Sequence, residues 1–198
     1  MIVLGLTGSI GMGKSEAAKV FKRKGCPVFD ADAVALRLLT EDEAAIAEVA
    51  SLFPDTVTGG VVDRVAVAKR VFEDSAALLS LEKMLHPRIQ AEAAGFMDEM
   101  AAIQAPVAVL EMPLLFETGA QSMCTAVAVV NAPEEVQQQR VLARPGMTAD
   151  RLDAIRARQT SAADKVARAD FIIDTTTGIP DMVLQIETIL ATLQTQFR

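Results

Sequence analysis

Gly8-Ser9-Ile10-Gly11-Met12-Gly13-Lys14-Ser15 is the stretch that decides the fold. An apolar run typical of a buried strand, Ile2–Thr7, precedes it, and a helical pattern begins near Lys14. The spacing G-x-x-x-x-G-K-[ST] is typical of a loop that wraps phosphate, because glycines let the backbone approach an anion and a helix N-terminus favours negative charge. Lys14 is expected to reach the β- and γ-phosphates, and the Ser15 hydroxyl to ligate Mg²⁺. We therefore predict that all eight residues of this loop bind a nucleotide.

Further short apolar runs alternate with helical patterns along the chain. The runs that indicate strands are Pro27–Asp30, Pro106–Glu111, Thr125–Asn131 and Phe171–Asp174. Their nearly continuous apolar character is typical of a parallel sheet covered on both faces. The expected fold is α/β, a P-loop NTPase-type parallel five-stranded sheet flanked by helices. Residues 33–103 carry almost no strand signal and are predicted to form a helical insertion, with residues 1–32 and 104–198 forming the core.

Helix ends are predicted from capping residues and prolines. The first helix is expected to stop at Gly25, and Thr40 with Glu43 indicates a capping box before 44–52. Prolines that favour the first turn of a helix, and hydroxyl residues that favour an N-cap, mark the later starts. Pro87 is expected to start a helix through Ile103, and Pro133 one through Ala143. Thr148 and Ser161 are expected to cap two more helices, and the last helix is expected over Pro180–Gln196.

Composition narrows the class of protein. The chain has 198 residues, enough for one compact domain with a small added lobe, and a net charge of −7, which argues against a general nucleic-acid binder. Cys26 and Cys124 lie far apart and are read as buried small hydrophobes rather than a disulfide or metal pair. No apolar stretch of about 18 residues is free of charge, so no membrane span is expected. We expect a cytoplasmic protein without nucleic-acid or membrane partners, a monomer, with an oligomer left open.

The nucleotide and the acidic residues beside it follow from the strand ends. A guanine-reading Asn-Lys-x-Asp segment is missing after 125–130, where the chain reads Asn131-Ala132-Pro133-Glu134, and ATP is therefore favoured. Ligands bind at the C-terminal ends of parallel strands. Asp32 is placed there to accept a proton from an attacking hydroxyl, with a helix N-cap as the alternative. For Asp30, support of a metal ion and a purely structural role are equally good interpretations. Glu111 stands at the position where a carboxylate would contact Mg²⁺ through a water molecule.

Three other groups are candidates for substrate and phosphate contacts. Arg140 and Arg144, four residues apart on a helix before a loop, suit a lid over ATP at about 140–165, with a solvated helix face as the alternative. Pro113-Leu114-Leu115-Phe116-Glu117 forms an apolar loop at the active edge, or simply packs in the core. His86 is the only histidine and precedes a proline. A lone histidine in this position usually has a structural role, and contact with the substrate is the alternative.

Taken together, these residues resemble the dephospho-coenzyme A kinase family. The resemblance rests on residues 6–15, Asp30-Ala31-Asp32, Leu85-His86-Pro87, Pro113–Glu117 and Gln159 after an arginine-rich lid. It implies ATP-dependent phosphorylation of the ribose 3′-hydroxyl of dephospho-CoA, the last step of coenzyme A synthesis, by a nucleotide-binding core, a helical CoA-binding lobe and a lid. Asp32 then matches the catalytic base, Lys14, Ser15, Arg140 and Arg144 match the ATP and Mg²⁺ contacts, and His86 borders the substrate lobe.

The chain departs from the family pattern at several positions. Met12 is bulky for a loop that closely approaches phosphate, and Pro145 and Thr175 replace the usual aspartate and asparagine. Leu36 stands where an arginine is usual, and Arg37 follows it. Two alternatives remain open: another small-molecule kinase acting on a nucleoside or nucleotide, and a non-catalytic nucleotide-dependent switch. The Asp30/Asp32 pair and the basic lid weigh against the switch, which needs no acceptor base.

Overall fold

A computed structural model describes residues 1–196 and divides the chain into two compact units. Unit 1 comprises Met1–Asp30 and Phe96–Arg198, and unit 2 comprises Ala31–Gly95. Helix α5, Ser75–Ala102, runs from the second unit into the first. Within residues 1–196 we find no helix whose length and apolar character would let it cross a bilayer.

The predicted five-stranded parallel sheet is confirmed and lies in unit 1. Its strand order is β2-β5-β1-β6-β7, and each neighbouring pair is parallel. The strands are β1 Ile2–Thr7, β2 Val28–Asp30, β5 Val107–Glu111, β6 Ala126–Asn131 and β7 Phe171–Asp174. The central strand β1 is buried along its whole length, which explains its unbroken apolar sequence. Because chain order reverses around β1, the carboxyl ends of β1, β5 and β6 form the edge where ligands bind in such sheets.

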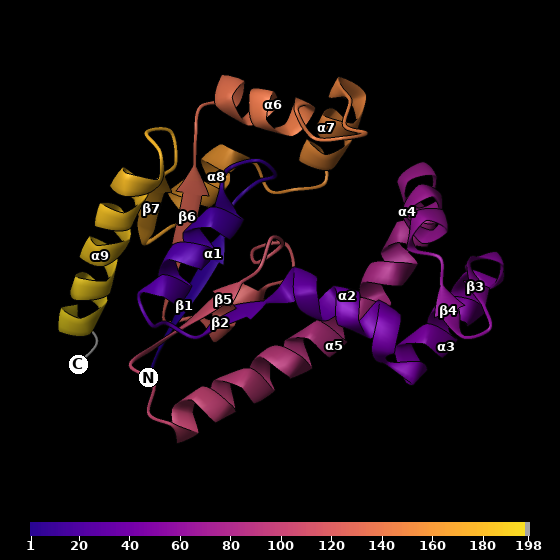
Figure 1. Cartoon of the computed structure of the whole chain (residues 1–198), viewed down its shortest axis with the longest axis horizontal. Coiled ribbons are helices and arrows are strands. Elements are labelled where there is room, and N and C mark those ends of the chain that lie inside the picture. The colour runs from indigo at the N-terminus through magenta and orange to yellow at the C-terminus, as the bar shows by residue number, and fades with distance from the viewer. Residues whose placement is uncertain (197–198) are drawn as a thin grey trace. The chain divides into compact units, whose positions relative to one another are not determined.

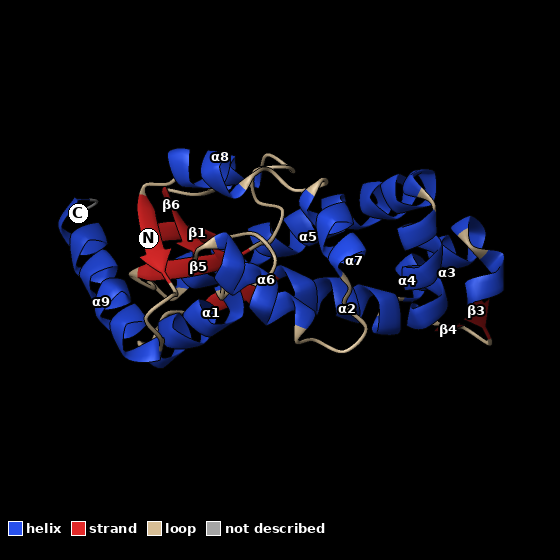
Figure 2. Ribbon diagram, turned by 90° about the horizontal axis from the view of Figure 1, so that it is seen from above, coloured by secondary structure: helices blue, strands red, loops and turns tan. Residues whose placement is uncertain are grey.

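Helices cover both faces of this sheet. On one face, α1 contacts both the sheet and α9, and α8 packs against β6 on the other (Figures 1 and 2). The helices of this unit are α1 Lys14–Arg23, α6 Glu134–Leu142, α7 Ala149–Arg156, α8 Ala162–Ala167 and α9 Ile179–Gln196, with a 3₁₀ turn at Ala120–Met123. Their apolar faces and the strands enclose one core that includes Leu4, Phe21 and Ile186.

Unit 2 is mainly helical and has its own core. Its helices are α2 Ala31–Glu41, α3 Glu43–Leu52, α4 Arg64–Glu73 and most of α5, with a 3₁₀ turn at Pro54–Thr56. Leu38, Val49 and Leu81 are buried in the core between them. A short antiparallel hairpin, β3 Val57–Thr58 and β4 Val61–Val62, interrupts the helices, and this hairpin was not predicted from the sequence.

Several helix starts differ from the predicted ones. Thr40 lies inside α2, where its hydroxyl donates to Leu36 O, and Asp42 caps α3 by accepting from Ala45 N. The capping box was therefore placed two residues too early. Pro87 lies within α5, which begins twelve residues before it at Ser75, so the prediction that it starts a helix was wrong. Pro133 directly precedes α6, and the N-caps at Thr148 and Ser161 are confirmed.

Candidate active site

Acidic and basic side chains meet at the carboxyl edge of the sheet. In the register of the strands, Glu111 at the end of β5 pairs with Asp30 at the end of β2 on one side and with Leu6 on the other. The phosphate loop follows β1 directly and leads into α1, which begins at Lys14. The structure thus brings three of the predicted site residues, Asp30, Glu111 and Lys14, to one edge of unit 1.

Lys14 and Glu111 form an ion pair. Lys14 Nζ lies 2.7 Å from Glu111 Oε1, and the two side chains are 11% and 4% exposed. A carboxylate with so little exposure needs a positive partner, and the Lys14 ammonium supplies it. The pair also holds the lysine side chain close to the end of β5.

Close packing explains two glycines of the phosphate loop. A Cβ on Gly8 would lie 2.3 Å from Val130 Cγ2, so only glycine fits against β6 there. Gly13 precedes α1 in the left-handed region with φ of 90°, and a Cβ on it would lie 3.1 Å from Thr175 Cβ. Met12, between glycines, is 3% exposed and belongs to the main core. The bulky residue is accommodated because its side chain packs in this core.

Arg140 is tied to the phosphate loop through Thr175. Its guanidinium donates to Thr175 Oγ1 at 2.9 Å and to Thr175 O at 2.7 Å. The same hydroxyl donates to Met12 O at 2.9 Å, and Thr175 is 2% exposed. Thr175 therefore links the end of β7 and helix α6 to the loop.

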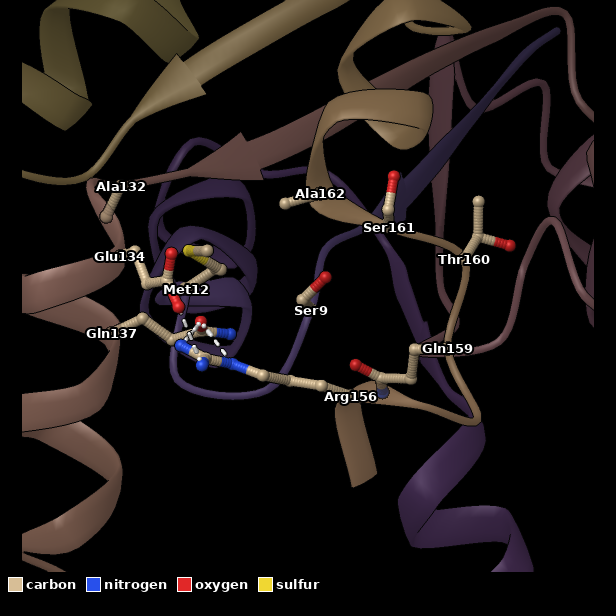
Figure 3. A pocket seen from close by; sticks show the side chains of 10 residues that line it. All are labelled: Ser9, Met12, Ala132, Glu134, Gln137, Arg156, Gln159, Thr160, Ser161 and Ala162. Carbon is tan, nitrogen blue, oxygen red and sulfur yellow. Dashed lines mark hydrogen bonds and ion pairs between the residues drawn. The ribbon is translucent and has the colours of Figure 1, made fainter. Parts of the chain in front are cut away.

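Two cavities flank the phosphate loop. One, of about 310 Å³, is lined by Arg140 and Arg144 together with Gly11, Gly13 and Ile179. The structure thus brings both predicted lid arginines to one cavity beside the loop. The other, of about 300 Å³, lies between Ser9 and Met12 of the loop and the segment from Arg156 to Ala162, as Figure 3 shows.

The apolar loop after β5 is held by hydrogen bonds from two directions. Pro113 O accepts from Thr7 Oγ1 at 3.2 Å and from Lys165 Nζ at 3.1 Å. Glu117 Oε1 accepts from Thr160 N at 2.7 Å and lies 3.0 Å from Lys165 Nζ. Leu115 is fully buried, so the structure assigns it to the core and not to a substrate-contacting surface. Pro113 and Leu114 are half-buried.

Lys165 is a buried cation at the C-terminal end of the predicted lid. Its side chain has no exposed surface, and desolvation by burial lowers its pKa, with the nearby charge of Lys14 acting in the same direction. The carboxylate of Glu117 opposes this shift and favours the charged form. The ion pair with Glu117 is therefore what allows a lysine to remain charged in this place.

The remaining predicted residues belong to unit 2. Asp32 is exposed, lies in the first turn of α2 and follows Asp30 by two positions. A carboxylate in the first turn suits the helix dipole, but it lies inside the helix and not at its N-cap. His86 is half-buried within α5. Arg37 forms an ion pair with Glu92 at 2.7 Å, and this carboxylate raises the arginine pKa.

The oxygen donors at the carboxyl edge suit Mg²⁺. Glu111 and Asp30 supply carboxylates, and Ser15, the second residue of α1, supplies an exposed hydroxyl. Among the described residues no group of three or more acidic, histidine or cysteine side chains could hold a metal by itself. An ion at this edge would thus take part of its shell from water and phosphate, as Mg²⁺ commonly does.

Sequence reasoning missed several residues that hold the site together. Five residues that were not among the candidates hold the two loops of the site by hydrogen bonds. Gln137 and Thr175 bond to the phosphate loop, Thr7 and Lys165 bond to the loop after β5, and Arg156 bonds to Gln137. One signal was available for Gln137, which precedes Arg140 by three residues and so shares its helix face. The others depend on contacts between segments far apart in the sequence.

The fold and the site define a P-loop kinase, an enzyme that transfers a phosphoryl group from a nucleotide. A family model described as dephospho-CoA kinase matches residues 2–181. A dephospho-CoA kinase of Rhodopseudomonas palustris is 47% identical over 190 residues, which cover 96% of this chain and 94% of the relative. The chain belongs to the dephospho-CoA kinase family.

Two solved structures share the fold of this chain. A crystal structure of a Thermus thermophilus protein has 36% identity and a TM-score of 0.80, with 97% of each chain covered. The dephospho-CoA kinase of Campylobacter jejuni has 24% identity and a TM-score of 0.73, covering 99% of this chain and 98% of that one. At that level of identity the second likeness supports the fold alone.

Proposed function

We propose that this chain transfers the γ-phosphoryl group of ATP to the ribose 3′-hydroxyl of dephospho-CoA, giving coenzyme A and ADP. Membership of the dephospho-CoA kinase family supports the acceptor and the donor. The observation in unit 1 that carries the proposal is the meeting of the phosphate-loop lysine, Lys14, with Glu111 in register with Asp30. A lysine and two carboxylates at the strand ends are the groups that phosphoryl transfer with a metal ion requires.

The phosphates of ATP are placed on the loop from Gly8 to Ser15. The N-terminus of α1 favours their negative charge, and Lys14 contributes a positive charge near the strand ends. The cavity of about 310 Å³ lined by Arg140 and Arg144 supports placing the rest of the nucleotide beside the loop. In this arrangement the two arginines offset charge on the transferring group.

Asp32 is proposed as the catalytic base. It accepts the proton of the 3′-hydroxyl while that oxygen bonds to the γ-phosphorus, and the bond from phosphorus to the β,γ-bridging oxygen breaks to release ADP. Ser15, Glu111 and Asp30 would hold Mg²⁺, which when bound supplies positive charge that stabilises the phosphate oxygens. Unit 2, including His86, is proposed to contact the acceptor, together with the half-buried Pro113 and Leu114 and with Glu117.

An acceptor panel tests this function. The purified protein is incubated with ATP, Mg²⁺ and one acceptor at a time (dephospho-CoA, adenosine, AMP or shikimate), and ADP release is measured by a coupled assay. The proposal predicts release that depends on dephospho-CoA and exceeds the rate with every other acceptor by orders of magnitude. Preferential phosphorylation of a nucleoside would move the chain to another acceptor class. ATP binding without phosphorylation of any acceptor would favour a nucleotide-dependent switch.

A further inference from the structure

The backbone of Ile10, in the middle of the phosphate loop, is hydrogen-bonded on both sides by glutamines from the segment after β6. Ile10 N donates to Gln159 Oε1 at 3.2 Å, and Gln137 Nε2 donates to Ile10 O at 2.7 Å. Gln137 comes from α6 and Gln159 from the turn after α7, so two separate elements hold one residue of the loop. Both side chains line the second cavity together with Ser9 and Met12 (Figure 3).

Arg156 determines how the Gln137 amide faces. Its Nε and Nη2 donate to Gln137 Oε1 at 3.0 and 2.5 Å, and its Nη1 donates to Glu134 Oε1 at 2.8 Å (Figure 3). A guanidinium has only donors, so the amide atom that faces it must be the oxygen. The amide nitrogen is then left to face Ile10 O. The same side chain with its amide reversed would present two donors to Arg156 and an acceptor to a carbonyl.

Burial makes this arrangement costly to break. Gln137 is 3% exposed, and a buried amide or carbonyl that loses its partner is left without water to replace it. The peptide group between Ile10 and Gly11, whose carbonyl accepts from Gln137, therefore has one preferred orientation. The peptide group before it, between Ser9 and Ile10, donates to Gln159 through Ile10 N and accepts from Met12 N through Ser9 O at 3.2 Å, so the turn that presents Gly11 to Gly13 is built around these two peptide groups.

We propose that Gln137 and Gln159 are positioning residues that hold the two peptide groups on either side of Ile10, with Arg156 orienting the Gln137 amide, so that α6 and the turn after α7 set the shape of the loop that receives the nucleotide phosphates. The inference rests on the proposed use of ATP but not on the identity of the acceptor. Its consequence is that nucleotide affinity depends on hydrogen bonds made outside the G-x-x-x-x-G-K-S motif.

The first test replaces the amide donor and keeps the shape. In Gln137→Glu an oxygen still faces Arg156 and strengthens that contact, but Ile10 O loses its donor and meets a second acceptor. Isothermal titration with ADP and Mg²⁺ is expected to show a dissociation constant raised at least about tenfold in a chain that still unfolds cooperatively and is folded at the temperature of the titration. Gln138→Glu, the same change at the next, exposed position of α6, is the control and is expected to bind ADP within about twofold of the unaltered chain.

The second test is at position 159, where the side chain must accept a hydrogen bond, whereas position 137 must donate one. Ile10 N needs an acceptor there, and Gln159→Glu keeps one, whereas Gln159→Leu removes it. ADP affinity is expected to stay within about threefold in Gln159→Glu and to fall about tenfold in Gln159→Leu. Equal losses in Gln137→Glu and Gln159→Glu would show that added negative charge, and not the Ile10 contacts, governs binding, and would overturn the proposal.

A double-mutant cycle tests the place given to Arg156. If Arg156 acts through Gln137, Arg156→Leu weakens ADP binding in the unaltered chain but adds nothing in a Gln137→Leu background. A full additional loss in that background would mean that Arg156 acts on the nucleotide directly and would contradict the proposal. Unchanged ADP binding in all these variants would also overturn it, whereas normal ADP binding by the unaltered chain with no transfer to dephospho-CoA would count only against the proposed acceptor.

Discussion

Gly13 is the residue at which the phosphate loop becomes a helix. Its φ of 90° lies in the left-handed region, and its α-carbon faces Thr175, whose hydroxyl donates to the preceding carbonyl, Met12 O. A side chain at this position would thus meet two obstacles at once, a strained backbone and a buried neighbour that fixes the loop.

Gly13→Ala is expected to damage nucleotide binding more than stability. The strain of a left-handed alanine costs about 1–2 kcal/mol, and the added methyl displaces Thr175 from Met12 O. We expect ADP affinity, measured by titration calorimetry, to fall at least about tenfold. Gly59→Ala is the matched control, because Gly59 has φ of 58° but open space around its α-carbon. It should lose similar stability and keep ADP affinity, and equal ADP binding in both variants would contradict the role of Thr175.

Asp32→Asn tests the proposed base at the same scale. Asparagine keeps the size of the side chain but cannot take up the proton of the acceptor hydroxyl, so kcat should fall by about 10²–10⁴-fold while ADP binding stays near normal. Glu43→Gln removes a first-turn carboxylate from the neighbouring helix α3 and controls for the lost helix-dipole interaction. Near-normal turnover in the Asp32 variant would remove this residue as the base.

Cys124 predicts a pH dependence of stability. Burial raises the pKa of its thiol from the ordinary 9.0 to about 12, so between these values the unfolded chain loses a proton that the folded chain keeps. Unfolding is therefore favoured as pH rises from about 9 towards 12, by up to about 1.4 kcal/mol per pH unit. Urea denaturation at pH 8 and 10.5 should show a smaller decrease for Cys124→Ala than for the unaltered chain. Identical slopes would mean that the thiol is not the cause.

Residue roles could be predicted where the motif itself carries the chemistry. The phosphate loop, Glu111 and Asp30 lie together as their positions at strand ends indicated. The effect of Met12 could not be foreseen, because its burial depends on a core assembled from β1, β6 and α9. The Ile10 contacts were equally hidden, since they join residues more than a hundred positions apart.

At the scale of elements, the ion pair between Lys165 and Glu117 joins α8 to the loop after β5. Lys165→Met leaves Glu117 without its cation and should lower the free energy of unfolding by about 3 kcal/mol, the low end for a broken buried pair, because Glu117 is 17% exposed. The double variant Lys165→Met, Glu117→Gln removes both charges and should recover more than half of this loss. Urea denaturation of the three chains measures both effects, and a double variant no more stable than Lys165→Met would contradict the coupling.

Elements were predictable where a periodic pattern or a cap dominates. The five strands of the sheet and the N-caps Thr148 and Ser161 agree with the structure. The predicted helix start at Pro87 was wrong, because proline is common in the first turn of a helix but here lies inside α5. The turns of α5 before Pro87 supply much of the unit 2 core. The β3–β4 hairpin was missed because each strand has only two residues, although Gly59-Gly60 between valines is a turn signal.

At the scale of the whole molecule, the two units divide the proposed work. Unit 1 carries the proposed nucleotide site, and unit 2 carries Asp32 and His86, which the family resemblance connects with the acceptor. The sheet could be predicted from the sequence because parallel strands leave a strong apolar pattern. The acceptor could be proposed only from the resemblance, because no local pattern in the chain encodes recognition of a CoA-like molecule.

The most direct test of the central claim follows the phosphorus atom. The protein is incubated with dephospho-CoA and ATP labelled in the γ-phosphate, and the product is identified by mass spectrometry and ³¹P NMR. We expect one labelled phosphoryl group on the ribose 3′-oxygen of each product molecule, with an equal amount of ADP. Label that appears only as free phosphate, or on a different acceptor atom, would contradict it.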